Sequence, residues 1–156
     1  KDKEISIYNN AVSNKNTSQK IYINKHDLTS GLTQINKKNF YLNIKAKLFG
    51  GNINEMVTQT YKVKSIKLFD FFKKKKIKSI DLIKIDTEGH ELNVLEGLGS
   101  QISNIKIILI EFHNNEIYLN YDSEKIHKFL VKKRFKLQKT FKFPLTKWED
   151  RIYIRD

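Results

Sequence analysis

Two carboxylates, Asp86 and Glu88, are the residues best placed to do chemistry, and only Thr87 separates them. They follow an apolar run, residues 80–85, and precede Gly89, after which apolar residues recur at helical spacing. This pattern predicts a strand, a tight turn and a helix. Ligands of open α/β sheets bind at the carboxyl ends of strands, so these acids and the free N–H groups of the helix can hold a polar small molecule.

A simpler interpretation is that Thr87 or Glu88 only caps the helix and that the acids favour its positive end. Capping explains one acid better than two. Asp86-Thr87-Glu88 also resembles the acidic motif with which nucleotide-sugar glycosyltransferases hold a divalent metal, and hard cations favour paired carboxylates. That motif does not account for the continuation from Gly89 to Gly97.

Residues 82–97 read LIKIDTEGHELNVLEG, which closely resembles the signature of the FkbM-type S-adenosylmethionine-dependent methyltransferases. Downstream, residues 107–113 are similar to the next strand of that family, which ends in an acidic residue. Upstream, residues 8–13 (YNNAVS) resemble the strand end at which the family approaches the adenine. The resemblance spans roughly the whole chain, and its specific part is the central motif.

This resemblance implies an α/β fold with a Rossmann-like class I methyltransferase sheet and antiparallel final strands. It also implies S-adenosyl-L-methionine as the cofactor and O-methylation as the reaction. The partner is then a small-molecule or glycan acceptor that offers a hydroxyl of a sugar, a lipid-linked glycan or a secondary metabolite. Residues 1–156 are expected to form a single, partial methyltransferase domain.

The resemblance places Asp86 beside the methyl-donor end of the cofactor, with Glu88 also on the cofactor side and with Asn10 and Ala11 lining the adenine pocket. Methyl transfer to an oxygen depends on positioning and on a base that accepts the hydroxyl proton. Asp86 is the first candidate for that base.

His113 is the second candidate base, because the unperturbed pKa of histidine lies near neutrality. An ordinary loop histidine in the turn at residues 113–115 is a slightly favoured alternative. Glu111 and His90 are candidates for the substrate side; for His90, a first-turn residue that faces solvent or a neighbouring strand is the favoured reading. No residue is assigned to a metal.

The chain of 156 residues is long enough for one domain with a real core. It has no cysteine and no apolar run of membrane-spanning length, so we expect a soluble, cytoplasmic protein. It begins at Lys1 and contains no G-x-G-x-x-G pattern. We therefore expect a fragment without its first two strands, inactive by itself and prone to aggregate along the unpaired central strand.

The net charge of +13 raises nucleic acid as a partner, and a basic, non-catalytic RNA-binding module is one alternative function. Nearly all of the basic residues are lysines, whereas readers of bases and phosphates favour arginine. The cluster Lys73–Lys76 closes a short amphipathic helix that carries Leu68, Phe69 and Phe72. A solvated helix end explains this cluster better, and no nucleic-acid partner is expected.

Alternation and helical periodicity predict the remaining elements. The first half is expected to hold strands at 5–8 and 20–24, a loop at 26–39, and a hairpin-like pair of strands at 40–49 and 58–68. The second half is expected to hold a buried strand at 105–112, a helix at 123–133 capped by Ser123, and strands at 135–141 and 151–155.

Overall fold

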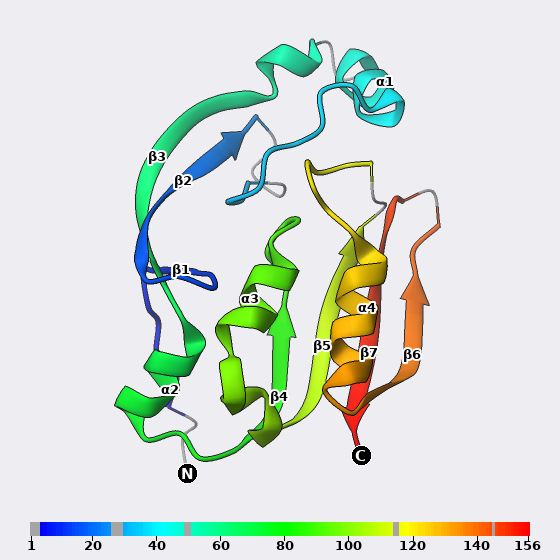
Figure 1. Cartoon of the computed structure of the whole chain (residues 1–156). Coiled ribbons are helices and arrows are strands. Elements are labelled where there is room, and N and C mark those ends of the chain that lie inside the picture. Colours follow the sequence, from blue (N-terminus) through cyan, green and yellow to red (C-terminus); the bar gives the residue numbers. More distant parts are fainter. Residues whose placement is uncertain (1–3, 26–29, 49–50, 114–115, 145) are drawn as a thin grey trace.

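A four-stranded sheet organises the second half of the chain (Figure 1). The computed structural model describes residues 4–25, 30–48, 51–113, 116–144 and 146–156. The strands are β4 (Ile80–Ile85), β5 (Ile105–His113), β6 (Phe135–Lys142) and β7 (Trp148–Arg155), in the order β4-β5-β7-β6. β4 and β5 are parallel, and β7 runs antiparallel to both β5 and β6. The predicted antiparallel finish is therefore confirmed.

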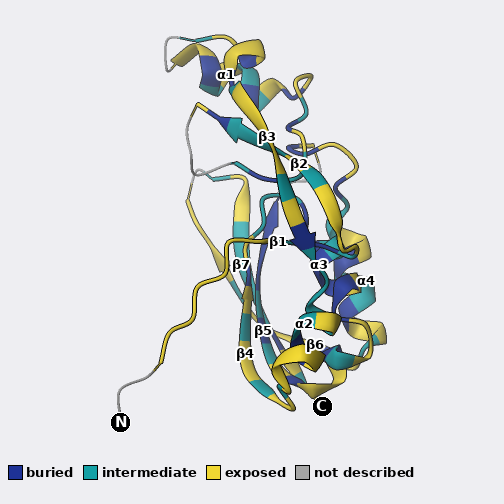
Figure 2. Ribbon diagram, turned by 90° about the vertical axis from the view of Figure 1, so that its left-hand side faces the viewer, coloured by how far each residue is buried: buried dark blue, intermediate teal, exposed yellow. Residues whose placement is uncertain are grey.

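Helices α3 (Glu91–Gly97) and α4 (Ser123–Lys132) cover one face of this sheet, as Figures 1 and 2 show from two sides. A 3₁₀ helix, η3 (Gly99–Asn104), joins α3 to β5. The cap of α4 differs from the prediction: the side chain of Asp122, rather than Ser123, accepts a hydrogen bond from the Lys125 N–H. The core between helices and sheet contains Ile85, Leu95, Leu98, Ile108, Ile110, Ile126, Leu130 and Tyr153.

A second, three-stranded sheet forms from the first half of the chain. Its strands are β1 (Ala11–Val12), β2 (Thr17–Asn24) and β3 (Val57–Ile66), in the order β1-β3-β2. β3 is antiparallel to β2 and parallel to β1. The short helix η2 (Ile53–Glu55) precedes β3, and α2 (Leu68–Lys75) follows it. The lysines at the end of α2 are exposed, which confirms the predicted solvated helix end.

The strand predicted at 40–49 is wrong, because Phe40–Leu48 forms helix α1, and the hairpin with residues 58–68 falls with it. Asn39 explains the difference: its side-chain oxygen accepts a hydrogen bond of 2.9 Å from the Leu42 N–H, as a helix N-cap does. Leu42 and Ala46, one turn apart, are buried, whereas Phe40 is 79% exposed. The alternation that favoured a strand thus includes positions that face solvent.

The strand predicted at 5–8 is also absent from the described residues. Residues 4–10 are extended but unpaired and form an exposed segment that leads into β1 (Figure 2). Ile5 and Ile7 are 85% and 90% exposed. Among the described helices, none has the length and apolarity that crossing a membrane requires.

β4 is the outer strand of its sheet and pairs with β5 alone among the described residues. Leu82 on this edge is 55% exposed. An unpaired edge strand with exposed apolar residues can pair with a strand of another chain. A lysine on the edge opposes this association. We expect Leu82→Lys to raise the concentration at which chain 1–156 self-associates by about tenfold, as measured by sedimentation, a change of about 1.4 kcal/mol.

Val131→Lys is the matched control, because Val131 is 51% exposed on α4, away from the strand edge. Equal self-association of the two variants would show that the edge of β4 does not mediate it.

Candidate active site

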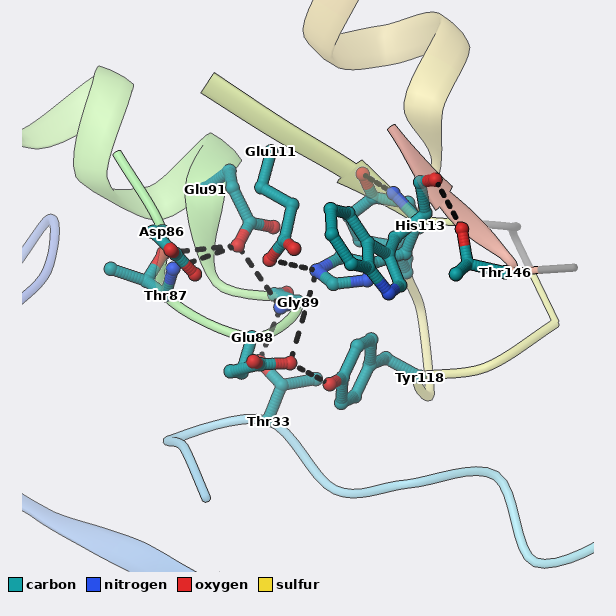
Figure 3. Close-up of polar contacts among 12 residues, drawn as sticks. Thr33, Asp86, Thr87, Glu88, Gly89, Glu91, Glu111, His113, Tyr118 and Thr146 are labelled. Atoms are coloured by element: carbon teal, nitrogen blue, oxygen red, sulfur yellow. Dashed lines mark hydrogen bonds and ion pairs between the residues drawn. The ribbon is translucent and has the colours of Figure 1, made fainter. Parts of the chain in front are cut away.

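The turn between β4 and α3 is held together by the carboxylate of Glu91, which is fully buried. One oxygen of Glu91 accepts three hydrogen bonds, from the N–H and O–H of Thr87 and from the N–H of Gly89, at 3.1, 3.2 and 3.1 Å (Figure 3). The helix N-cap is His90, which makes no side-chain capping bond. Neither Thr87 nor Glu88 therefore caps the helix, and the organising acid is one that the sequence analysis missed.

Two glycines of the motif are required by close packing. Gly89 has φ +85°, and a Cβ there would lie 2.5 Å from the ring of Tyr118. At Gly97 a Cβ would lie 2.2 Å from the backbone oxygen of Ser13. Gly97 therefore brings the end of α3 against the chain that follows β1, and a larger residue there would separate the two.

Asp86 lies at the outer side of the turn. Its carboxylate forms an ion pair of 2.8 Å with Lys84, and its side chain remains 40% exposed. Partial burial alone raises the pKa of Asp86, but the hydrogen bond from Lys84, the contact with Glu111 and the positive charges of Lys84 and His113 together hold the pKa below its ordinary value. Asp86 is therefore ionised and accessible at neutral pH.

Glu88, Glu111 and His113 converge on one point, as Figure 3 shows. Nε2 of His113 lies 3.2 Å from Oε2 of Glu111 and 3.9 Å from Oε2 of Glu88. Glu88 has φ +52° and accepts a hydrogen bond from the Tyr118 hydroxyl. The left-handed backbone of Glu88 turns its carboxylate from the end of β4 toward the end of β5.

Burial governs the protonation of this group. Desolvation raises the pKa of Glu88 to about 7, against the lowering effect of the Tyr118 hydrogen bond and of His113. Burial alone lowers the pKa of His113, but the carboxylates of Glu111, Glu91 and Glu88 together raise it above its ordinary value. The surrounding carboxylates therefore favour the positively charged form of His113.

A cavity of about 400 Å³ opens above these side chains. Its floor contains the polar residues from the ends of β4 and β5, and helix α1 supplies one wall. Aromatic and basic residues surround the floor. The lining consists of Tyr41, Leu42, Lys45, Asp86, Glu88, Glu111, His113, Ile117, Tyr118, Thr146, Lys147 and Trp148.

Comparison with protein-family models identifies a match over residues 1–138, to the methyltransferase FkbM domain. The chain belongs to the FkbM methyltransferase family. Membership indicates a methyltransferase and confirms the resemblance seen in residues 82–97. No curated protein and no solved structure matches the chain.

Of the residues predicted for an FkbM methyltransferase site, the cavity brings together Asp86, Glu88, Glu111 and His113. Asn10 and Ala11 line a separate hollow beside β3, with Lys62 and Lys64. His113 is the last residue of β5 and is 7% exposed; Asn114 and Asn115, with which the loop alternative placed it, lie outside the described residues.

His90 is not among the residues that line the cavity. It is 9% exposed, and its ring nitrogens lie 2.9 Å from the Ser13 hydroxyl and 3.3 Å from the Thr33 hydroxyl. These contacts join α3 to the chain after β1 and to the segment before α1.

Proposed function

We propose that residues 1–156 form a methyltransferase domain with a Rossmann-like sheet that transfers a methyl group from S-adenosylmethionine to a hydroxyl. The observation that carries the proposal is the cavity at the carboxyl ends of the parallel strands β4 and β5, where Asp86 and His113 face one space. Ligands of α/β sheets bind at this edge. Family membership supplies the reaction class.

The donor set suits S-adenosylmethionine, whose sulfonium and ammonium groups are cationic. Asp86 is an ionised, accessible carboxylate, and the carboxyl groups of Glu88 and Glu111 line the floor beside it. When bound, the cofactor supplies an electrophilic methyl group. Asn10 and Ala11 are proposed to contact the adenine.

In the proposed reaction, Asp86 receives the hydroxyl proton of the acceptor. The acceptor oxygen forms the new bond to the methyl carbon while the bond from that carbon to sulfur breaks, and the electron pair stays on sulfur. Positioning by the cavity walls lowers the barrier because the reacting atoms are held in line. His113 is the second candidate base, and its Nε2 is directed at Glu111.

The lining also supports a proposal for the acceptor. Tyr41 and Trp148 contribute aromatic rings to the lining, and Lys45 and Lys147 contribute positive charge. Aromatic faces pack against the apolar faces of sugar rings and other cyclic compounds. A hydroxyl of a sugar, a glycan or a secondary metabolite is therefore the proposed acceptor.

Calorimetric titration with S-adenosylmethionine tests the proposal. The natural protein is compared with its Asp86→Ala variant. We expect binding by the natural protein and weaker binding by the variant. Absence of binding by a folded protein would overturn the methyltransferase assignment. Binding of a nucleotide sugar with Mn²⁺ would then identify glycosyl transfer as the function.

A further inference from the structure

Three side chains from two strand ends present possible metal ligands to one point in the cavity floor. The ligand atoms of Glu88, Glu111 and His113 all lie within 4.8 Å of one another. Figure 3 shows the two carboxylates and the imidazole directed toward the same space. His113 Nε2 and Glu111 Oε2 are 3.2 Å apart.

These separations suit a shared divalent cation. Protein oxygen and nitrogen atoms bind Mg²⁺ or Zn²⁺ at about 2.0–2.2 Å. Two ligands at that distance are about 3.0 Å apart when they meet at a right angle and about 4.2 Å apart when they are opposite. The measured 3.2 and 3.9 Å from His113 Nε2 lie between these values.

The second observation is that two of these atoms are buried and lack a hydrogen-bond partner. Nε2 of His113 and Oε2 of Glu111 make no hydrogen bond within the described part of the chain. The two residues are only 7% and 8% exposed. Buried polar atoms are normally satisfied, and here the two atoms face each other at 3.2 Å while neither hydrogen-bonds to any other described residue.

The packing around His113 fixes the direction of its ring. The ring lies edge-on to Tyr118 and Tyr121, with centroids 4.9 and 5.7 Å away. The Tyr121 hydroxyl accepts a hydrogen bond of 2.9 Å from the His113 backbone N–H. The imidazole is therefore held by contacts that leave its Nε2 aimed at the carboxylates.

Acidic side chains lie on several sides of this point. Asp86, Glu88, Glu91 and Glu111 surround the point, and Oε2 of the fully buried Glu91 likewise lacks a hydrogen-bond partner in the described residues. Lys84 is occupied by Asp86 at the exposed side of the cavity. Buried carboxylates are stable when they are paired or bind a metal.

We propose that Glu88, Glu111 and His113 bind a divalent cation of the Mn²⁺ or Zn²⁺ type at the floor of the acceptor cavity. The imidazole favours these ions over Mg²⁺ and Ca²⁺, which prefer oxygen ligands alone. Three protein ligands leave positions for water or for an oxygen of the acceptor. This role deepens the proposed methyl transfer and rests on it, because a cation lowers the pKa of a hydroxyl bound to it and Asp86 can then accept its proton.

Calorimetry and electron paramagnetic resonance with MnCl₂ test the site on the chelator-treated natural protein without S-adenosylmethionine. We expect one saturable Mn²⁺ site. Loss of an outer partner of a metal site costs about 10- to 100-fold in affinity, so loss of a ligand should cost at least about tenfold. Glu111→Gln keeps the shape of the side chain, and His113→Phe keeps the ring between its tyrosine neighbours.

Glu124→Gln is the matched control, because Glu124 is exposed on α4 and paired with Lys128. Circular dichroism verifies that each variant is folded. The metal proposal is overturned if the folded natural protein binds neither Mn²⁺ nor Zn²⁺, or if Glu111→Gln and His113→Phe bind as well as the control.

The two proposals fail separately. S-adenosylmethionine binding without Mn²⁺ or Zn²⁺ binding removes the metal site and leaves methyl transfer in place. Mn²⁺ binding that Glu111→Gln abolishes, without S-adenosylmethionine binding, retains the metal site but overturns its role in methyl transfer.

Discussion

Asp86→Asn is expected to lower kcat for methyl transfer by at least about 100-fold, because a positioned general base contributes about 10²–10⁴ to a rate. Asparagine keeps the size and hydrogen bonding of the side chain but cannot accept the hydroxyl proton. Binding of S-adenosylmethionine should fall much less than kcat. Single-turnover measurements, which separate chemistry from binding, provide the test.

Asp81→Asn is the control for Asp86→Asn. Asp81 also lies on β4 and is paired with a lysine, Lys106 at 2.7 Å, but it is 87% exposed at its side chain and does not line the cavity. Its substitution should leave kcat within about twofold, since exposed ion pairs contribute about 0–1 kcal/mol. A kcat for Asp86→Asn equal to that of Asp81→Asn would remove Asp86 from the role of base.

Glu91→Ala is expected to lower the free energy of unfolding by about 2–4 kcal/mol, because a fully buried donor left without a partner costs about 1–3 kcal/mol and the three donors at Thr87 and Gly89 are only partly buried. The variant removes the acceptor of three hydrogen bonds at Thr87 and Gly89. The turn that directs Glu88 would loosen as well. Denaturant unfolding followed by circular dichroism measures the change.

Glu96→Ala is the control on the same helix, because Glu96 is exposed and accepts one hydrogen bond, from Asn14. It should change stability by less than about 1 kcal/mol. Glu91→Gln keeps one oxygen acceptor and should recover part of the lost stability. Equal effects of Glu91→Ala and Glu96→Ala would show that the buried carboxylate does not hold the turn.

Long, regular elements could be predicted from the sequence. The apolar runs at 80–85 and 105–112 are strands, and the periodic segment at 123–133 is a helix that ends at Lys132. The alternating apolar residues at 40–49 predicted a strand, but in the helix only Leu42 and Ala46, one turn apart, are buried, whereas Phe40 and Leu48 are each 79% exposed. Alternation is decisive only where packing covers every second residue.

The sequence by itself determined the family, through residues 82–97, and the position of Asp86 and Glu88 after a buried strand. Only the tertiary structure decided which distant residues meet them. The parallel pairing of β4 with β5 carries Glu111 and His113 to the same edge, and α1 supplies a wall of the cavity from residues 40–48, far upstream of Asp86. The tertiary structure also shows that Glu91 is buried and that its carboxylate holds the turn between β4 and α3. Local pattern reports periodicity along the chain, whereas burial and strand pairing arise from contacts between residues far apart in it.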